Sequence, residues 1–468
     1  MRYEDAAWRE KQRIRLDVNN VFGTHGLTPA ELEAEAPRAA AAIAAVQERR
    51  ADLGWPLLPD QDVTPFEQFA AAHRDRIDTF VVLGIGGSAL GNIAVQTAIN
   101  GPFYNLLPRE QRGWPRLLVL DNSDPELNAG ALRMLDLRRT MFNVISKSGT
   151  TAETMASFLY FRQALVEAVG EDRLGDHIVL TTDPNSGFLR QIGQREGWTM
   201  FDLPPKVGGR FSVLTSVGLL SAAMTGVNIR ELLAGAAYGR ELAANPDPLR
   251  NPAALGALIN YLCFRKGKPI VVMMPYANRL RDVADWFAQL WAESLGKAVD
   301  RQGKPARVGQ TPVKALGATD QHSQVQLYME GPYDKLINFI AVEQYAETAP
   351  IPTAYADLEG VSYLGGHTMA ELIQAEQQAT AIALSEAGQP NITHIFPEIN
   401  AFTLGQFFML MEMQTAIAGE LYDINAFDQP GVEAGKINTY ALLGRRGFEE
   451  RRAAIAARAQ ALDSRWVV

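Results

Sequence analysis

The chain has little cysteine and no long apolar run. Its one cysteine, Cys263, cannot form a disulfide within the chain, and it stands in the apolar run 258–264, where we expect it to pack as a small hydrophobic side chain. No stretch approaches the roughly 18 apolar residues that a membrane span requires. The first ten residues also lack the apolar segment of a signal peptide. These features predict a protein of the reducing cytoplasm.

Positive charge is scarce as well. The 44 lysines and arginines are outnumbered by 53 aspartates and glutamates, for a net charge of −9, whereas nucleic-acid-binding proteins usually carry a basic excess. The sequence contains no Cys/His cluster and no His-Glu-x-x-His motif, so it predicts no metal site. An anionic substrate would therefore have to be held by a few local groups.

The 468 residues exceed the roughly 250–300 at which one hydrophobic core stops growing, so more than one domain is expected. Residues 1–70 are rich in alanine and glutamate and predict a helical arm. Apolar runs of strand length follow at 79–83, 116–120, 141–145, 177–181, 268–274, 335–340 and 391–396. Helical spacing of apolar residues is found at 91–99, 152–169, 282–297, 368–386 and 404–421.

This alternation is typical of parallel sheets covered by helices. A polar stretch with three prolines at 244–252 divides it into two parts. We predict an α/β fold with two doubly wound parallel-sheet domains, 71–243 and 244–440, between the helical arm at 1–70 and a helical tail at 441–468.

A glycine-rich segment, Gly84-Ile-Gly-Gly-Ser-Ala-Leu-Gly, lies between a predicted strand and a predicted helix. Glycines let the backbone approach a ligand, and the free N–H groups of a helix start attract an anion. The same segment fits the dinucleotide fingerprint, which makes a nicotinamide enzyme an alternative. That alternative expects an acidic residue about 20 positions later, and the nearest candidate, Asp121, fits this spacing poorly.

A hydroxyl-rich segment, Ser146-Lys-Ser-Gly-Thr-Thr, also joins a predicted strand to a predicted helix. Hydroxyls, an ammonium group and the positive end of a helix together suit a phosphate dianion. The order of a Walker A loop is absent, so a nucleoside triphosphate is not indicated. The alternative is an ordinary helix cap by Thr151 or Thr154, which needs one hydroxyl rather than four.

Two further segments carry candidate charged groups. In Val207-Gly-Gly-Arg the glycines would let Arg210 approach a ligand, and a permanent cation there could stabilise developing negative charge; a surface arginine is the alternative. In the aromatic segment 286–297, Trp286, Gln289, Glu293 and Lys297 share one helical face. Partial desolvation would make Glu293 a better base, whereas a solvated Glu293–Lys297 pair is the alternative.

The remaining polar segments are Gly317-Ala-Thr-Asp-Gln-His322 and Phe427-Asp-Gln-Pro-Gly-Val-Glu-Ala-Gly-Lys436. His322 stands among polar residues rather than in an apolar stripe, which leaves both a structural and a chemical role open. Lys436 follows a turn-forming Pro-Gly pair, so it could reach a ligand or be solvated.

Taken in this order, the six segments closely resemble those of the glucose-6-phosphate isomerase family, from about Val81 to Lys436. The resemblance implies two sugar-isomerase (SIS) domains, interconversion of glucose 6-phosphate and fructose 6-phosphate through a cis-enediol(ate), no cofactor, and a homodimer in which His322 is shared across the interface. It implies these catalytic residues: Glu293 as the base, Arg210 as the stabilising cation, and His322 with Lys436 for ring opening. It implies these substrate contacts: Ser146, Lys147, Ser148 and Thr151 for phosphate, and Gly87, Ser88, Gln289 and Gln429 for the sugar.

The sequence departs from the family pattern at two positions. Leu295 stands where many relatives have asparagine, and Pro430 stands where they often have tryptophan. Both are beside catalytic residues and leave those side chains intact. A dual isomerase that also accepts mannose 6-phosphate, and a non-catalytic SIS module that senses sugar phosphates, remain alternatives.

Overall fold

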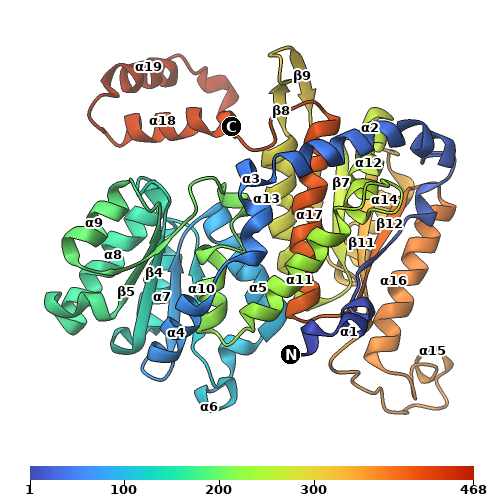
Figure 1. The fold of residues 1–468 in the computed structure, drawn as a ribbon, viewed down its shortest axis with the longest axis horizontal. Helices are drawn as coiled ribbons and strands as arrows, with labels where there is room; N and C mark the ends of the chain where they lie inside the picture. Colours follow the sequence, from blue (N-terminus) through green and yellow to red (C-terminus); the bar gives the residue numbers. More distant parts are fainter. The chain divides into compact units, whose positions relative to one another are not determined.

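The computed structural model describes residues 1–468, which form two compact units, Met1–Ala426 and Phe427–Val468. Figure 1 shows the chain with its elements labelled. The second unit begins at Phe427, ahead of the helical tail that we expected from 441. The expected boundaries after residues 70 and 243 fall inside the first unit and stay predictions.

The first sheet contains five parallel strands in the order β3-β2-β4-β5-β6. Their bounds are β2 (Thr79–Leu83), β3 (Arg116–Leu120), β4 (Thr140–Ile145), β5 (Ile178–Thr182) and β6 (Thr199–Asp202). The central strands β2, β4 and β5 are buried throughout, which explains their largely apolar sequences. β6 was not predicted because it is a partly exposed edge strand that ends in an aspartate.

Helices surround the first sheet, and their order confirms the predicted alternation. They are α4 (Thr64–His73), α5 (Leu90–Asn100), α6 (Arg109–Arg112), α7 (Pro125–Met134), α8 (Ala152–Val169), α9 (Phe188–Glu196) and α10 (Ser216–Met224). Phe158 and Phe161 of α8 pack with Phe142 of β4, Leu180 of β5 and the buried Trp198. This core holds the carboxyl ends of β2 and β4 in register.

The second sheet has the order β1-β12-β11-β7-β10. Its strands are β1 (Arg15–Asp17), β7 (Ile270–Pro275), β10 (Thr311–Lys314), β11 (Lys335–Gln344) and β12 (Asn391–Glu398). All pairs are parallel except β1 with β12. The expectation of a purely helical arm is therefore wrong at one point, because β1 adds an edge strand to this sheet. A strand of three residues is too short for an alternating pattern to be recognised in the sequence.

The remaining elements of the first unit are α1 (Ala6–Lys11), α2 (Pro29–Glu48), α3 (Arg50–Leu53), α11 (Ile229–Leu242), α12 (Pro252–Arg265), α13 (Arg281–Leu295), α14 (Val325–Glu330), α15 (Glu359–Ser362), α16 (Met369–Glu386), α17 (Ala401–Leu421) and the hairpin β8 (Lys297–Val299) with β9 (Pro305–Val308). Helix α13 ends at Leu295 and not at Lys297 as expected, because Lys297 begins β8.

Helices α11, α13 and α17 lie between the two sheets (Figure 1). Helix α17 is buried over nearly its whole length, so it is apolar on all sides, as a helix inside a core must be. Helix α13 packs on α5, which follows β2 of the first sheet, and on β7 and β10 of the second sheet. No helix is both long enough and apolar enough to cross a lipid bilayer.

The second unit is a helical hairpin formed by α18 (Glu433–Leu442) and α19 (Glu449–Gln460). The ring of Tyr440 meets that of Phe448 edge to face at 5.5 Å. The guanidinium of Arg445 lies 4.4 Å from the centre of the Tyr440 ring. These contacts between the two helices and their connecting segment close the hairpin.

Candidate active site

Two of the predicted loops meet at one edge of the first sheet. The chain proceeds from β2 to β3 on one side and then returns to β4 on the other side of β2. In an open α/β sheet, ligands bind outside the carboxyl ends of the strands at such a reversal of strand order. The glycine-rich loop follows β2 and the hydroxyl-rich loop follows β4, so both line this position.

The hydroxyl-rich loop is organised by its own side chains. The Oγ of Ser146 accepts from the N–H of Gly149 at 3.0 Å and lies 3.1 Å from the Oγ1 of Thr151. The hydroxyl of Ser148 lies 2.7 Å from that of Thr150. Thr151 precedes α8, but no side chain caps this helix. The capping alternative therefore lacks the hydrogen bond that would define it, and the helix start keeps its capacity for an anion.

Lys147 has a partner outside this loop. Its ammonium group donates to the carbonyl oxygen of Pro205 at 2.5 Å and to that of Val207 at 3.3 Å. Burial lowers the pKa of Lys147, and Asp183 nearby offsets part of this effect. Lys147 therefore connects the hydroxyl-rich loop to the segment that carries Arg210.

The glycine-rich loop touches the arginine segment directly. A Cβ on Gly87 would lie 2.1 Å from the carbonyl carbon of Gly209, so the two backbones are in contact. The hydroxyl of Ser212 donates to the carbonyl oxygen of Gly209 at 2.6 Å and lies 3.3 Å from that of Gly87. A Cβ on Gly86, whose φ is +59°, would lie 2.9 Å from Nε2 of Gln289. Glycine is thus required for the loop, the arginine segment and α13 to converge.

Glu293 lies on α13 with a donor at each carboxylate oxygen. Nε2 of Gln289 donates to Oε1 at 3.1 Å, and Nη1 of Arg210 donates to Oε2 at 3.4 Å. The ammonium group of Lys297 donates to the backbone carbonyl of Glu293 at 2.9 Å. One third of the Glu293 side chain is exposed, so a ligand can reach the carboxylate. The structure therefore brings Glu293, Arg210 and Gln289 together.

Arg210 is buried rather than at the surface, with 3% of the residue exposed. Its Nε donates to Oγ of Ser294 at 2.7 Å, and its Nη2 donates to the carbonyl oxygen of Ala426 at 2.5 Å. Ser294 is fully buried and was not singled out from the sequence. A sequence signal for it exists, because Ser294 is a hydroxyl residue directly after Glu293, and the residues on either side of this pair are apolar.

The other predicted residues lie at turns or on helix α18. Ser88 ends the turn Gly86–Ser88. His322 ends the turn Thr319–His322 after β10; it is exposed, and its ring has no hydrogen-bond partner. Gln429 precedes the turn Pro430–Val432 in the second unit. Lys436 lies on α18, where its ammonium group is paired with Glu433 at 2.7 Å.

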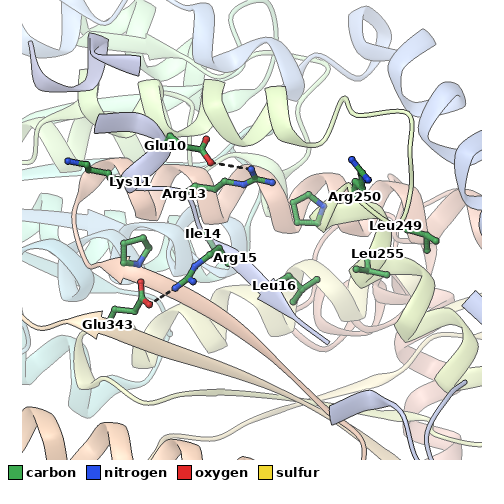
Figure 2. Close-up of a pocket in the computed structure, with 12 residues that line it drawn as sticks. Glu10, Lys11, Arg13, Ile14, Arg15, Leu16, Leu249, Arg250, Leu255 and Glu343 are labelled. Carbon is green, nitrogen blue, oxygen red and sulfur yellow. Dashed lines mark hydrogen bonds and ion pairs between the residues drawn. The ribbon is translucent and has the colours of Figure 1, made fainter. Parts of the chain in front are cut away.

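A cavity of about 490 Å³ lies elsewhere, between the arm and the second sheet (Figure 2). Two of its cations already have acidic partners: Arg13 is paired with Glu10 at 3.3 Å and Arg15 with Glu343. It contains none of the predicted residues. No three His, Cys, Asp or Glu side chains come together in a way that could hold a metal ion.

Comparison with known proteins identifies the family. The family model described as "Phosphoglucose isomerase" matches residues 67–446. The chain belongs to this family. A relative in Carboxydothermus hydrogenoformans, named glucose-6-phosphate isomerase, is 49% identical and is aligned over 94% of this chain and 96% of its own length. A relative of the same name in Rubrobacter xylanophilus is 47% identical over 93% of this chain and 99% of its own length.

Solved structures of other proteins share the fold. A hypothetical protein from Thermus thermophilus superposes with a TM-score of 0.83 at 40% identity, and the match covers 92% of this chain and all of that one. A glucose-6-phosphate isomerase from Chlamydia trachomatis superposes with a TM-score of 0.73 at 24% identity, over 97% of this chain and 86% of that one. The predicted doubly wound α/β fold is confirmed, and nothing favours the nicotinamide alternative.

Proposed function

We propose that the chain catalyses the reversible isomerisation of glucose 6-phosphate to fructose 6-phosphate, with Glu293 as the base. The observation that carries this proposal is the Glu293 carboxylate. Gln289 and Arg210 donate to it. Its helix, α13, contacts the glycine-rich loop, which is beside the uncapped, hydroxyl-rich start of α8. A base, a cation and an anion site are the parts that an aldose–ketose isomerase of a sugar phosphate needs.

The phosphate group would bind at the start of α8. Ser146, Ser148 and Thr151 supply hydroxyls there, and the backbone N–H groups of the first helical turn add the positive end of the helix dipole. Lys147 adds a positive charge at the rear of this loop. Holding the phosphate at one end fixes the distance from it to the reacting carbons.

The reacting carbons would lie against Glu293. The carboxylate removes the proton from C2 of the open-chain sugar, and the electron pair of the broken C–H bond moves into a cis-enediolate. A proton moves from O2 to O1 of this intermediate, and the carboxylic acid returns its own proton to C1, which leaves a carbonyl at C2 and completes the change from aldose to ketose. Arg210 offsets the negative charge on the enediolate oxygens, while Gly87, Ser88, Gln289 and Gln429 contact the sugar hydroxyls.

Ring opening needs a second pair of groups, for which we propose His322 and Lys436. They would move protons at the ring oxygen and at the anomeric hydroxyl. The exposed imidazole of His322, without a partner in its own chain, is suited to act in the site of a second copy, so we propose a homodimer.

The buried single cysteine suits a cytoplasmic enzyme.

The deciding experiment replaces Glu293 with glutamine, which keeps the shape of the side chain and removes its basicity. Loss of a general base should lower kcat by about 10²- to 10⁴-fold. The matched control is Glu33→Gln, the same chemical change on an exposed position of α2, which should leave kcat unchanged. If Glu293→Gln kept its activity within about tenfold of wild type, the assignment of the base would be wrong.

A further inference from the structure

The guanidinium group of Arg210 donates to two neutral acceptors that are themselves buried. Nε donates to Oγ of Ser294 at 2.7 Å, and Nη2 donates to the carbonyl oxygen of Ala426 at 2.5 Å. Nη1 donates to Oε2 of Glu293 at 3.4 Å. Ser294 is fully buried, and Ala426 is 1% exposed, so water does not compete for these acceptors.

We propose that Ser294 is a positioning residue of the isomerase: its hydroxyl fixes the guanidinium plane of Arg210 so that Nη1 faces the base and the reacting carbons. This inference rests on the proposed function and adds to it a residue that acts only through Arg210. Ser294 and Glu293 are neighbours on α13. One short helix segment therefore sets both the base and the orientation of the cation.

A neutral acceptor is suited to this task for an electrostatic reason. A carboxylate in place of Ser294 would add a fixed negative charge beside Arg210, whereas a hydroxyl orients the cation without adding charge. When Glu293 takes the proton from C2, the negative charge passes from its carboxylate to the enediolate. Arg210 can stabilise the charge on the enediolate without delay only if its guanidinium plane is already fixed, because preorganised groups need not reorient during the reaction.

The experiment is a double-mutant cycle with Ser294→Ala and Arg210→Lys. Lysine has no Nε–H donor, so the contact with Ser294 is absent in that background. Because hydrogen bonds to charged groups are strong, Ser294→Ala alone should lower kcat by about tenfold to a hundredfold, with KM within about twofold of wild type. In the Arg210→Lys background the same change should have an effect below about twofold, because coupled residues are not additive.

A binding measurement supplies a second readout that does not depend on turnover. A phosphorylated hydroxamate, which is a planar mimic of the enediolate, should bind Ser294→Ala more weakly by about the factor lost in kcat/KM. The corresponding sugar-alcohol phosphate, which carries no enediolate charge, should bind within about twofold of wild type. Equal weakening of both ligands would indicate a general distortion of the site and would overturn the proposal.

The matched control is Ser221→Ala in α10. Ser221 is 1% exposed, and its hydroxyl has no hydrogen-bond partner, so its replacement should leave kcat and both affinities unchanged. Equal losses from Ser294→Ala in the wild-type and Arg210→Lys backgrounds would show that Ser294 supports only the helix. If wild type interconverts the two sugar phosphates while Ser294→Ala matches it, this inference fails alone; an inactive wild type would refute the proposed function itself.

Discussion

The backbones of Gly87 and Gly209 touch: a Cβ placed on Gly87 would lie 2.1 Å from both the carbonyl carbon and the carbonyl oxygen of Gly209. Gly87 follows β2, and Gly209 precedes Arg210 in a segment beyond β6. Their contact brings Arg210 to the carboxyl edge of the first sheet. The position of Arg210 therefore depends on the absence of a side chain at Gly87.

Gly87→Ala should displace the turn that carries Arg210. No real Cβ is found 2.1 Å from a backbone atom, so the Gly209 backbone must move, and small displacements of a catalytic group cost up to about a hundredfold in rate. We expect kcat/KM to fall by at least about tenfold. Gly208→Ala is the control, because Gly208 has φ −75° and nothing lies within 4 Å of its Cβ position. Equal activity of the two variants would contradict this account of the contact.

Thr151→Val should weaken the phosphate site. Valine keeps the shape of threonine and removes the hydroxyl, and a hydrogen bond to a charged group contributes about 1.5–3 kcal/mol. We expect KM for the sugar phosphate to rise by about tenfold or more, and inorganic phosphate to inhibit correspondingly less. Thr154→Val is the control in the same helix, since the buried hydroxyl of Thr154 has no partner. A rise in KM that was the same in both variants would assign the effect to the helix instead.

Mixing two inactive variants should restore activity if His322 acts in the site of a second copy. Glu293→Gln and His322→Ala chains, unfolded together and refolded, would form heterodimers with one intact site each. Random pairing then predicts about a quarter of the wild-type activity. Each variant refolded alone is the control. No gain on mixing, although heterodimers are detected by a tag on one chain, would place His322 in its own chain's site.

Acid should destabilise the protein through His394. This histidine is fully buried in β12, and burial lowers its pKa from 6.5 to about 4. The folded protein keeps the ring neutral, while the unfolded chain takes up a proton below pH 6.5. The contribution of the neutral His394 ring to the free energy of unfolding is therefore fully present above pH 6.5 and is lost as the pH falls toward 4. The loss is on the order of 3 kcal/mol.

The corresponding measurement is the free energy of unfolding by urea at several pH values between 4 and 7. His394→Leu should show a flatter dependence than wild type in this window, whatever its effect on stability at pH 7. The pKa of His177 is also lowered by burial, so part of the slope should remain. Identical slopes for wild type and His394→Leu would refute the role of His394.

The strands of both sheets were predictable wherever they are buried on both faces. The runs around β2, β4, β11 and β12 are mostly apolar, because most of their residues are buried in the sheets. Strands β1, β6 and β10 were missed. They are short edge strands, and partners distant in the sequence determine their conformation rather than any local pattern.

The sequence by itself determined the types of group at the site: hydroxyls before α8, glycines after β2, and a carboxylate in the aromatic helix α13. Spacing and residue type suffice for these, because each is a local property of one loop or one helix. Only the tertiary structure decided which of them meet. Arg210 and Glu293 are 83 positions apart in the chain, and their contact, like that of Arg210 with Ser294, depends on glycines that let separate segments converge and on burial that excludes water.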